Sequence, residues 1–408
     1  MRSKRVSFLA VLFCGCISVS SAAGCTTAIV SGTSTVDGRP LLFKHRDSDV
    51  LQNRLMFFDD GEYEYIGLVN SPDTLGKEVW AGCNSVGFAI MNSASYNVNV
   101  NDTTSIRDRE GMIMKQALKN CATLEDFEGL LRKLPRPLGA EANFGVIDAQ
   151  GGAACYETGN YNFTKFDAND PSTAPFGYIV RTNYCFTGDR DHDYGLIRYE
   201  TADDVFHVAS VTHSLSFEFI LTDASRCLKH SLTGIDLRND IPMSSESPHF
   251  VNFRDFIPRF SSSASVVVHG VRADESPWLT TVWTILGFQL CSVAVPTWVR
   301  GGNQLPAIVV ADSSGNAPLC DMALTLKNRC FPLQRGSGRH YLNLAAVLNE
   351  EKNGILQRIR PLEVTIIEET KGRLREWREK GIHREGIHKF YHWLDETVLG
   401  AYREHFGF

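Results

Sequence analysis

The strongest constraint on this chain lies at residue 25, where an apolar leader ends and a predicted strand begins. Residues 1–5 are basic, residues 6–19 form an apolar run, and residues 20–24 are mostly small. This is the pattern of an export signal with a cleavage site just before Cys25. The apolar run is shorter than the roughly 20 residues of a membrane-spanning helix. We therefore expect a signal peptide over 1–24 and an exported chain, periplasmic or secreted, over 25–408 that begins with a cysteine.

A series of short apolar segments follows, and their length and β-branched content are typical of strands. The first two are joined by residues 36–39, Val-Asp-Gly-Arg, and Asp-Gly tolerates the positive φ angles of a hairpin turn. The predicted strands of this region are 26–31, 41–44, 54–58, 63–69, 78–83 and 87–92.

Two helices interrupt the strands. One has Met114, Ala117, Leu118 and Cys121 on a single face, and the other begins with a capping box at residues 123–126 and ends before Pro135. The strands predicted next are 143–148, 153–157, 162–166, 178–184, 265–271, 280–287 and 292–299, with a helix near 214–230.

The C-terminal part, from about residue 342, reads as helical. We expect a helix over 342–360 that stops at Pro361, followed by further helical segments near 368–380 and 387–402. Runs of strands separated by runs of helices favour an α+β fold, and no linker or repeat divides the chain. One catalytic domain over 25–408, with the helices from about 342 packed on it, is therefore the predicted organisation.

Several classes of protein are disfavoured by composition. The net charge is -6 and no block of Lys and Arg suggests nucleic acid as a partner. No later apolar run is long enough to span a membrane. The eleven cysteines lack the paired spacing of a zinc site, so we expect no metal and no organic cofactor. Disulfide pairing and oligomeric state cannot be read from the sequence.

A cysteine at a free N-terminus carries its own base. A thiol has a pKa near 8.5 and an α-amino group one near 7.7–8.0, so part of the amine is neutral at pH 7 and can accept the thiol proton. The same amine can later protonate the leaving nitrogen of an amide. Cys25 is thus a candidate nucleophile that needs no histidine, only groups that orient its amine and stabilise an oxyanion.

Polar residues at the ends of three predicted strands are candidates for those groups. Lys44 and Asp47 end the second strand, in the segment Lys-His-Arg-Asp. Asn92 ends the strand in 84–92, and Asn183 ends the strand in 178–184. Each one stands where a sheet edge opens onto a cleft.

These segments, taken in order, resemble the N-terminal nucleophile hydrolase superfamily. The matching stretches are "CTTAIV", "FKHRDSD", "NSVGFAIMN", "NFGVIDAQGGAACYE" and "VRTNY", from Cys25 to Tyr184. Their order is most similar to the isopenicillin N acyltransferase-like family, with choloylglycine hydrolases and secreted dipeptidases as relatives. Five motifs in order are specific where one would be weak.

The resemblance implies a four-layer αββα sandwich of two antiparallel sheets, and attack of Cys25 on an amide bond to form a thioester. It places Asp47 where the family keeps an acid that holds the free amine, and Asn92 and Asn183 where relatives have oxyanion or substrate-binding amides. Lys44 stands where bile-salt hydrolases and dipeptidases carry an arginine. This is a departure, because lysine is a point charge and not a planar fork. Arg46 faces the same side of the strand as Lys44 and the opposite side from Asp47.

Other readings of Cys25 remain open. It is also a candidate lipid attachment site, which would make the protein a surface lipoprotein and a binding module, although Ala22 fits a lipobox poorly. Within the same superfamily, an acyltransferase or a dipeptidase would use the same thioester. The substrate in all enzymatic readings is a small amide. Arg181 is expected to pair with a nearby acid rather than with a substrate.

Overall fold

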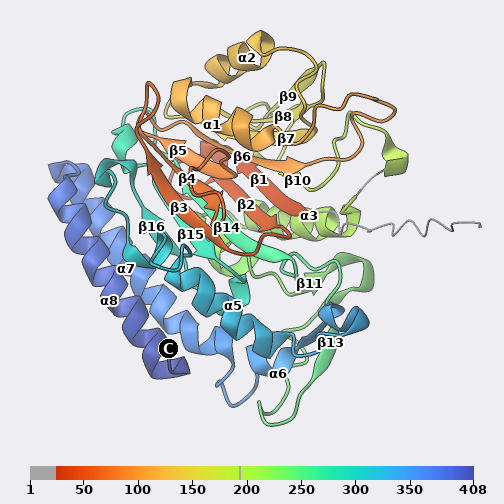
Figure 1. The fold of residues 1–408 in the computed structure, drawn as a ribbon, viewed down its shortest axis with the longest axis vertical. Helices are drawn as coiled ribbons and strands as arrows, with labels where there is room; N and C mark the ends of the chain where they lie inside the picture. Colours follow the sequence, from red (N-terminus) through yellow and green to blue (C-terminus); the bar gives the residue numbers. More distant parts are fainter. Residues whose placement is uncertain (1–23, 193) are drawn as a thin grey trace, which may run out of the picture.

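Two antiparallel sheets pack face to face at the centre of the protein (Figure 1). The computed structural model describes residues 24–192 and 194–408, so all of the predicted signal peptide except Gly24 lies outside the described residues. The first sheet has the order β10 (Tyr178–Arg181), β1 (Cys25–Val30), β2 (Leu41–Asp47), β14 (Ser262–His269), β15 (Thr281–Leu286) and β16 (Val295–Thr297). The second has the order β3 (Asn53–Phe58), β4 (Tyr65–Asn70), β5 (Ala81–Asn84), β6 (Ala89–Ala94), β7 (Ala142–Ile147), β8 (Ala153–Thr158) and β9 (Phe163–Asp167).

The two sheets approach closely where β1 and β2 lie over β6 and β7. Gly145 on β7 makes this approach feasible, because a Cβ there would lie 3.0 Å from Ile29 and 3.1 Å from Leu42 on the opposite sheet. Both of these side chains are buried in the core between the sheets. The predicted hairpin turn joins β1 to β2, and Gly38 has a φ of 75° in it. Cys25 thus begins a strand that has a hydrogen-bonded neighbour on each side.

Helices α1 (Glu110–Asn120) and α2 (Leu124–Lys133) cover the outer face of the second sheet (Figure 1). The ring of Phe127 on α2 packs edge-on against Phe144 and Tyr156 of that sheet, at centroid distances of 5.7 and 5.2 Å. The predicted capping box is confirmed, since Thr123 and Asp126 exchange side-chain to backbone hydrogen bonds.

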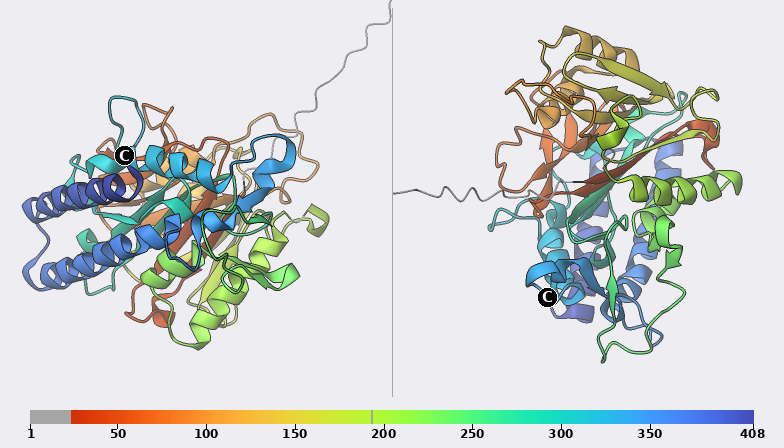
Figure 2. Two further views of the ribbon diagram at one scale, coloured as in Figure 1. Left: turned by 90° about the horizontal axis from the view of Figure 1, so that it is seen from below. Right: turned by 90° about the vertical axis from the view of Figure 1, so that its right-hand side faces the viewer.

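The remaining helices lie on the side of the first sheet (Figure 2). Of these, α3 packs on β10 and β1, and α5 packs on β15. The expected α+β architecture, two antiparallel sheets between helical layers, is confirmed. None of the helices in the described ranges has the length and apolar character to cross a membrane. The helices are α3 (Leu196–Val211), α4 (Phe217–Phe219), α5 (Pro318–Cys330), α6 (Leu344–Val347), α7 (Ile355–Lys380) and α8 (Arg384–Phe406).

The prediction that Pro361 ends a helix is wrong. Residues 342–360 do not form one helix, because β17 (Tyr341–Asn343) and α6 occupy the first part, and α7 begins only at Ile355 and runs through Pro361. Pro361 is past the first turn of α7, so it removes one intrahelical hydrogen bond. The apolar face of α7 also packs against the core, with Ile359 and Ile366 buried, and this tertiary packing outweighs the missing bond.

The helix predicted over 214–230 is also largely wrong. The structure has only α4 and a π-helical turn over Ile220–Ala224 there, and the chain then enters the short strand β11 (Lys229–His230). β11 pairs with β12 (Ile235–Asp236), and β13 (Phe250–Asn252) pairs with β17. Arg226, two residues beyond the π-helical turn, is fully buried.

That arginine joins α7 to the rest of the core. Arg226 and Glu363 form a bidentate ion pair with N–O distances of 2.8 and 2.6 Å, and their side chains are 0% and 2% exposed. Arg226 also donates to the carbonyls of Leu221, Gln289 and Ser292, so all parts of the guanidinium are satisfied.

We expect Glu363→Ala to destabilise the protein by about 3–5 kcal/mol, because it leaves the Arg226 charge buried without its partner. Urea unfolding followed by circular dichroism measures this change. The control is Glu385→Ala on α8, whose carboxylate pairs with Lys389 at the surface and should leave the midpoint unchanged. If the two substitutions lowered the free energy of unfolding equally, the Arg226–Glu363 ion pair would not stabilise the core in the way described.

Candidate active site

Cys25 is the first residue of β1 and lies opposite Arg46 of β2. Its side chain is largely buried, with 7% of the residue exposed, and it lines a cavity of about 450 Å³. A second cavity, of about 360 Å³, lies on the side of Gly24. Cys25 therefore stands at the boundary between two cavities, with its thiol on one side and the preceding residue on the other.

The nitrogen of Cys25 is held by Asn183. The Cys25 N–H donates to Oδ1 of Asn183 at 3.0 Å, and Nδ2 of Asn183 donates to the carbonyl of Ala94 at 2.8 Å. Arg198 on α3 donates to the same Oδ1 at 2.6 Å and to the Cys25 carbonyl at 2.6 Å. Burial, followed by the nearby Arg259, lowers the pKa of Arg198 to about 9. Two donors therefore converge on the Asn183 oxygen, which fixes the start of β1.

Gly24 fills a place that has no room for a side chain. A Cβ on it would clash with the guanidinium of Arg259 and would lie 2.9 Å from Asn183 Oδ1 and 3.0 Å from Arg198 Nη2. Gly24 is buried among these polar groups. The position just before Cys25 is therefore enclosed by two cationic side chains and one amide.

Asp47 lies at the end of β2 and lines the same cavity as Cys25. Its Oδ2 accepts from Arg259 at 2.6 Å, and its Oδ1 accepts from Ser262 at 2.7 Å. His45 lies 2.8 Å from the Ser262 hydroxyl, and burial lowers the pKa of His45 to about 4, so this ring is neutral at pH 7. In the described chain, Asp47 thus fixes Arg259 beside Gly24 and makes no hydrogen bond to Cys25.

Lys44 is buried and holds the side chain of Asn92. Its Nζ donates to Asn92 Oδ1 at 2.6 Å and to the carbonyl of Trp80 at 2.9 Å. Burial lowers the pKa of Lys44 to about 8, and the nearby Cys25 opposes that shift. Because Lys44 occupies the oxygen of the Asn92 amide, the NH₂ group of Asn92 is the part left to donate into the cavity.

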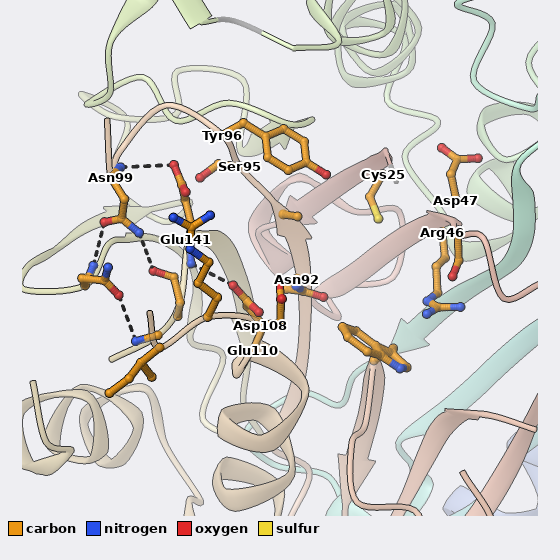
Figure 3. Close-up of a pocket in the computed structure, with 18 of the residues that line it drawn as sticks. Cys25, Arg46, Asp47, Asn92, Ser95, Tyr96, Asn99, Asp108, Glu110 and Glu141 are labelled. Atoms are coloured by element: carbon orange, nitrogen blue, oxygen red, sulfur yellow. Dashed lines mark hydrogen bonds between the residues drawn. The ribbon is translucent and has the colours of Figure 1, made fainter. Parts of the chain in front are cut away.

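Arg46 is the residue of β2 that pairs with Cys25 of β1. It donates to Asn53 at 2.7 Å and lies over the ring of Trp80, 5.0 Å from its centroid. Figure 3 shows the side chains of Arg46 and Asp47 pointing in opposite directions beside Cys25, as alternation along a strand predicts. Burial lowers the pKa of Arg46 to about 10, so it stays cationic at neutral pH.

The structure brings all five predicted site residues together. Cys25, Lys44, Asp47 and Asn92 line the first cavity, and Asn183 lines the second beside Gly24. The expected pairing of Arg181 with an acid is confirmed, with Glu157 2.8 Å away.

Sequence reasoning missed two arginines. Arg198 and Arg259 come from α3 and from the loop before β14, and both lie far from Cys25 in sequence. Arg198 stands in a segment without any motif, so only the fold reveals it. Arg259 precedes a run of serines that leads into a predicted strand, and that weak signal did not distinguish it from other surface arginines.

Comparisons with known proteins find only distant likenesses. No protein-family model matches the chain, and no curated protein matches its sequence. Among solved structures, it is similar to the Caenorhabditis elegans ortholog of N-acylethanolamine-hydrolyzing acid amidase, with 14% identity, a TM-score of 0.40, and coverage of 62% of this chain and 92% of that one.

Two bacterial enzymes are similar to a comparable degree. A variant of conjugated bile acid hydrolase from Clostridium perfringens has 12% identity and a TM-score of 0.37, covering 68% of this chain and 93% of that one. Penicillin V acylase from Agrobacterium tumefaciens has 12% identity and a TM-score of 0.36, covering 67% and 86%. At such low values, function has to be argued from the site itself.

We expect Cys25 to react first when the native protein is treated with iodoacetamide. It lines a cavity, whereas burial raises the thiol pKa of seven other described cysteines. Peptide mapping by mass spectrometry, before and after denaturation, gives the order of labelling. Labelling of Cys83 or Cys155 ahead of Cys25 would show that the cavity does not admit the reagent to the thiol.

Proposed function

We propose that this protein is an exported cysteine amidase of the N-terminal nucleophile type, which cleaves a linear amide bond through a thioester on Cys25. One observation carries the proposal: the nitrogen of Cys25 is held by Asn183 while its side chain lines a cavity that Asn92 and Lys44 also line. This is the arrangement that an N-terminal nucleophile needs, with the base fixed and an amide donor on the cavity wall.

The first step is proton transfer from the Cys25 thiol to its own amine. Once the leader is removed, the amine keeps the hydrogen bond to Asn183 Oδ1 that the peptide N–H makes in the described chain. Arg198 and Arg259 lie beside the place of Gly24. Neighbouring positive charges disfavour a protonated amine, so they increase the fraction that can act as a base.

The thiolate then attacks the carbonyl carbon of the amide. A C–S bond forms, and negative charge develops on the carbonyl oxygen. The NH₂ group of Asn92 is the donor available for that charge, because Lys44 holds its oxygen. The C–N bond breaks as the Cys25 ammonium returns its proton to the leaving nitrogen. Water, activated by the same amine, hydrolyses the thioester and releases a carboxylic acid.

The geometry divides the roles of the two asparagines. Both were expected to be oxyanion or substrate-binding amides. Asn183 presents its oxygen to the Cys25 nitrogen and commits its NH₂ to Ala94, so we assign it the positioning of the amine. Asn92 keeps the oxyanion role, and Lys44 acts through it as a positioning residue. Asp47 acts one step further out, through Arg259.

The alternatives of the same superfamily differ only in what resolves the thioester. An acyltransferase would use an amine in place of water, and adding a nucleophilic amine would then give a transamidation product. The lipoprotein alternative puts a lipid on Cys25, whose nitrogen is surrounded by the polar groups of Asn183, Arg198 and Arg259. An acyl chain on that nitrogen would cover these groups without pairing them, which disfavours it.

We expect the exported chain to begin at an unmodified Cys25 and to hydrolyse a small amide. Intact mass and N-terminal sequencing of the protein made by its own host test the first part. For the second, Cys25→Ala should lower kcat/KM by at least about a thousandfold, while Cys121→Ala, a buried cysteine at the end of α1, should retain activity.

The outcomes separate the alternatives. A lipid mass on Cys25 would support the lipoprotein instead, and a mature start elsewhere would remove the amine base. Retained hydrolysis in Cys25→Ala would exclude Cys25 as the nucleophile.

We further expect Asn92→Ala to lower kcat about 10²–10³-fold through loss of the oxyanion donor. Lys44→Met should lower kcat as well, because it frees the Asn92 amide to rotate. If Lys44 acts through Asn92, the double variant should be no slower than Asn92→Ala alone, and a double-mutant cycle measures this coupling. Additive losses would instead show that Lys44 contributes to the reaction independently.

A further inference from the structure

The cavity on the thiol side of Cys25 extends to the start of α1. Its wall is formed by Lys44, Arg46 and Asn92 together with Glu110 and the loops around residues 99–108 and 139–141. Figure 3 shows Glu110, Asp108 and Glu141 on the other side of Asn92 from Arg46 and Asp47. The acyl part of a substrate bonded to Cys25 would lie in this cavity, because the leaving nitrogen must lie near the amine, on the Asn183 side.

Glu110 is a buried carboxyl without a cationic partner. It is 8% exposed, and its Oε1 accepts from the backbone N–H of Glu141 at 2.8 Å. Among residues 24–192 and 194–408, no Lys, Arg or His side chain forms an ion pair with it. A buried carboxylate is costly unless a cation or several donors neutralise it. Its place in the first turn of α1 gives it some support from the helix dipole, but leaves the side facing the cavity unpaired.

The lining of the cavity carries charges of both signs. Lys44 and Arg46 lie near the thiol, and Glu110 lies close enough to Lys44 to act on its pKa, with further carboxylates beside Glu110. Asp108 is one of these, and its backbone has a φ of 58°, in the left-handed region that non-glycine residues seldom adopt. Arg107 is a further basic residue of this lining, and it is exposed, with its Nε bonded to the Thr104 carbonyl at 3.5 Å.

The lining of the cavity is mixed. Trp80, Tyr96 and Ile106 offer apolar surface, whereas Glu110 lacks a cation and Asn70 Oδ1 has no hydrogen-bond partner in the described part of the chain. Asn99, Asn160 and Glu141 are already hydrogen-bonded within the protein. A fatty chain would cover Glu110 and Asn70 without pairing them, which costs free energy. A chain that ends in a protonated amine would instead neutralise Glu110 and leave the other polar groups hydrated.

We propose that the acyl group of the substrate carries a protonated amine, which Glu110 binds in this cavity. The substrate class is thus an aminoacyl or amino-alkanoyl amide, such as a short peptide, and not a fatty or bile-acid amide. This inference rests on the proposed amidase function, from which the direction of the acyl group is taken. Glu110 is the specificity-determining residue in this assignment.

The preference for a cation should depend on pH. Burial, with a smaller contribution from the acids Asp108 and Glu141, raises the pKa of Glu110 to about 7; the backbone N–H donors and Lys44 oppose this rise, and the Tyr96 hydroxyl is neutral. Glu110 is therefore mostly charged above pH 7 and mostly neutral below it. The preference for a cationic acyl group should grow as the pH rises through about 7 and fall as the pH drops below it.

The test compares three para-nitroanilides with acyl chains of matched length: aminohexanoyl, heptanoyl and adipoyl. We expect kcat/KM for aminohexanoyl to exceed that for heptanoyl about tenfold or more at pH 8, and adipoyl to be the poorest. Because the two values are taken as a ratio, titration of the Cys25 amine cancels. Glu110→Gln keeps an oxygen for the Glu141 N–H and should bring the ratio close to one at every pH. Glu385→Gln, at the surface of α8, is the matched control and should keep the wild-type ratio.

A binding measurement separates this inference from the proposed function. Calorimetry on Cys25→Ala, with aminohexanamide and heptanamide as probes, reports the site without turnover. If the anilides are hydrolysed with no preference for the amine, or Glu110→Gln keeps the preference, the Glu110 assignment is overturned while the amidase stands. If no anilide is hydrolysed but aminohexanamide binds only when Glu110 is present, the proposed amidase function is rejected while the cation-binding role of Glu110 is retained.

Discussion

The hydrogen bond between the Cys25 nitrogen and Asn183 Oδ1 is the contact on which the rest of the site depends. It joins the first residue of β1 to the chain just after β10, the neighbouring strand of the same sheet. Arg198 completes it by binding both the amide oxygen and the Cys25 carbonyl. A strand normally frays at its first residue, but here two side chains, Asn183 and Arg198, hold that residue in place. The precision of the site therefore comes from the sheet and from α3, not from a flexible loop.

The same sheet supplies charge as well as position. Successive side chains of β2 point to opposite faces of the strand. Lys44 and Arg46 lie near the thiol, whereas Asp47 binds Arg259 beside Gly24. Burial lowers the pKa of Lys44 and Arg46, because removing a cation from water is unfavourable. A thiolate or an oxyanion formed nearby would offset part of this desolvation energy.

Much of this arrangement is readable in the sequence, and the exceptions have physical reasons. The strands and the capping box of α2 follow from local pattern, since each depends on residues close together in the chain. The five candidate site residues are predicted from motif order and the family resemblance, and the structure places them around Cys25 and Gly24. Arg198, Arg259 and Glu110 are not predicted in either way, because they enter the site only through long-range packing. Pro361 shows the limit of local rules: a helix that packs its apolar face on the core can contain a proline that an isolated helix would not tolerate.

Gly24 has a consequence for how this protein has to be handled. In the described chain it occupies the polar enclosure beside Cys25, and the Cys25 nitrogen is part of a peptide bond there. The lone pair of a peptide nitrogen is delocalised into the carbonyl and cannot accept the thiol proton. If the proposed mechanism holds, an uncleaved molecule would therefore be folded but inert. For an enzyme of the proposed type, the specific activity of a sample would be proportional to the fraction of molecules that begin at Cys25, and not to the fraction that is folded. A tag or an initiator methionine left in front of Cys25 would keep the molecule inactive, and purification methods that select folded protein or molecular size would not remove such molecules.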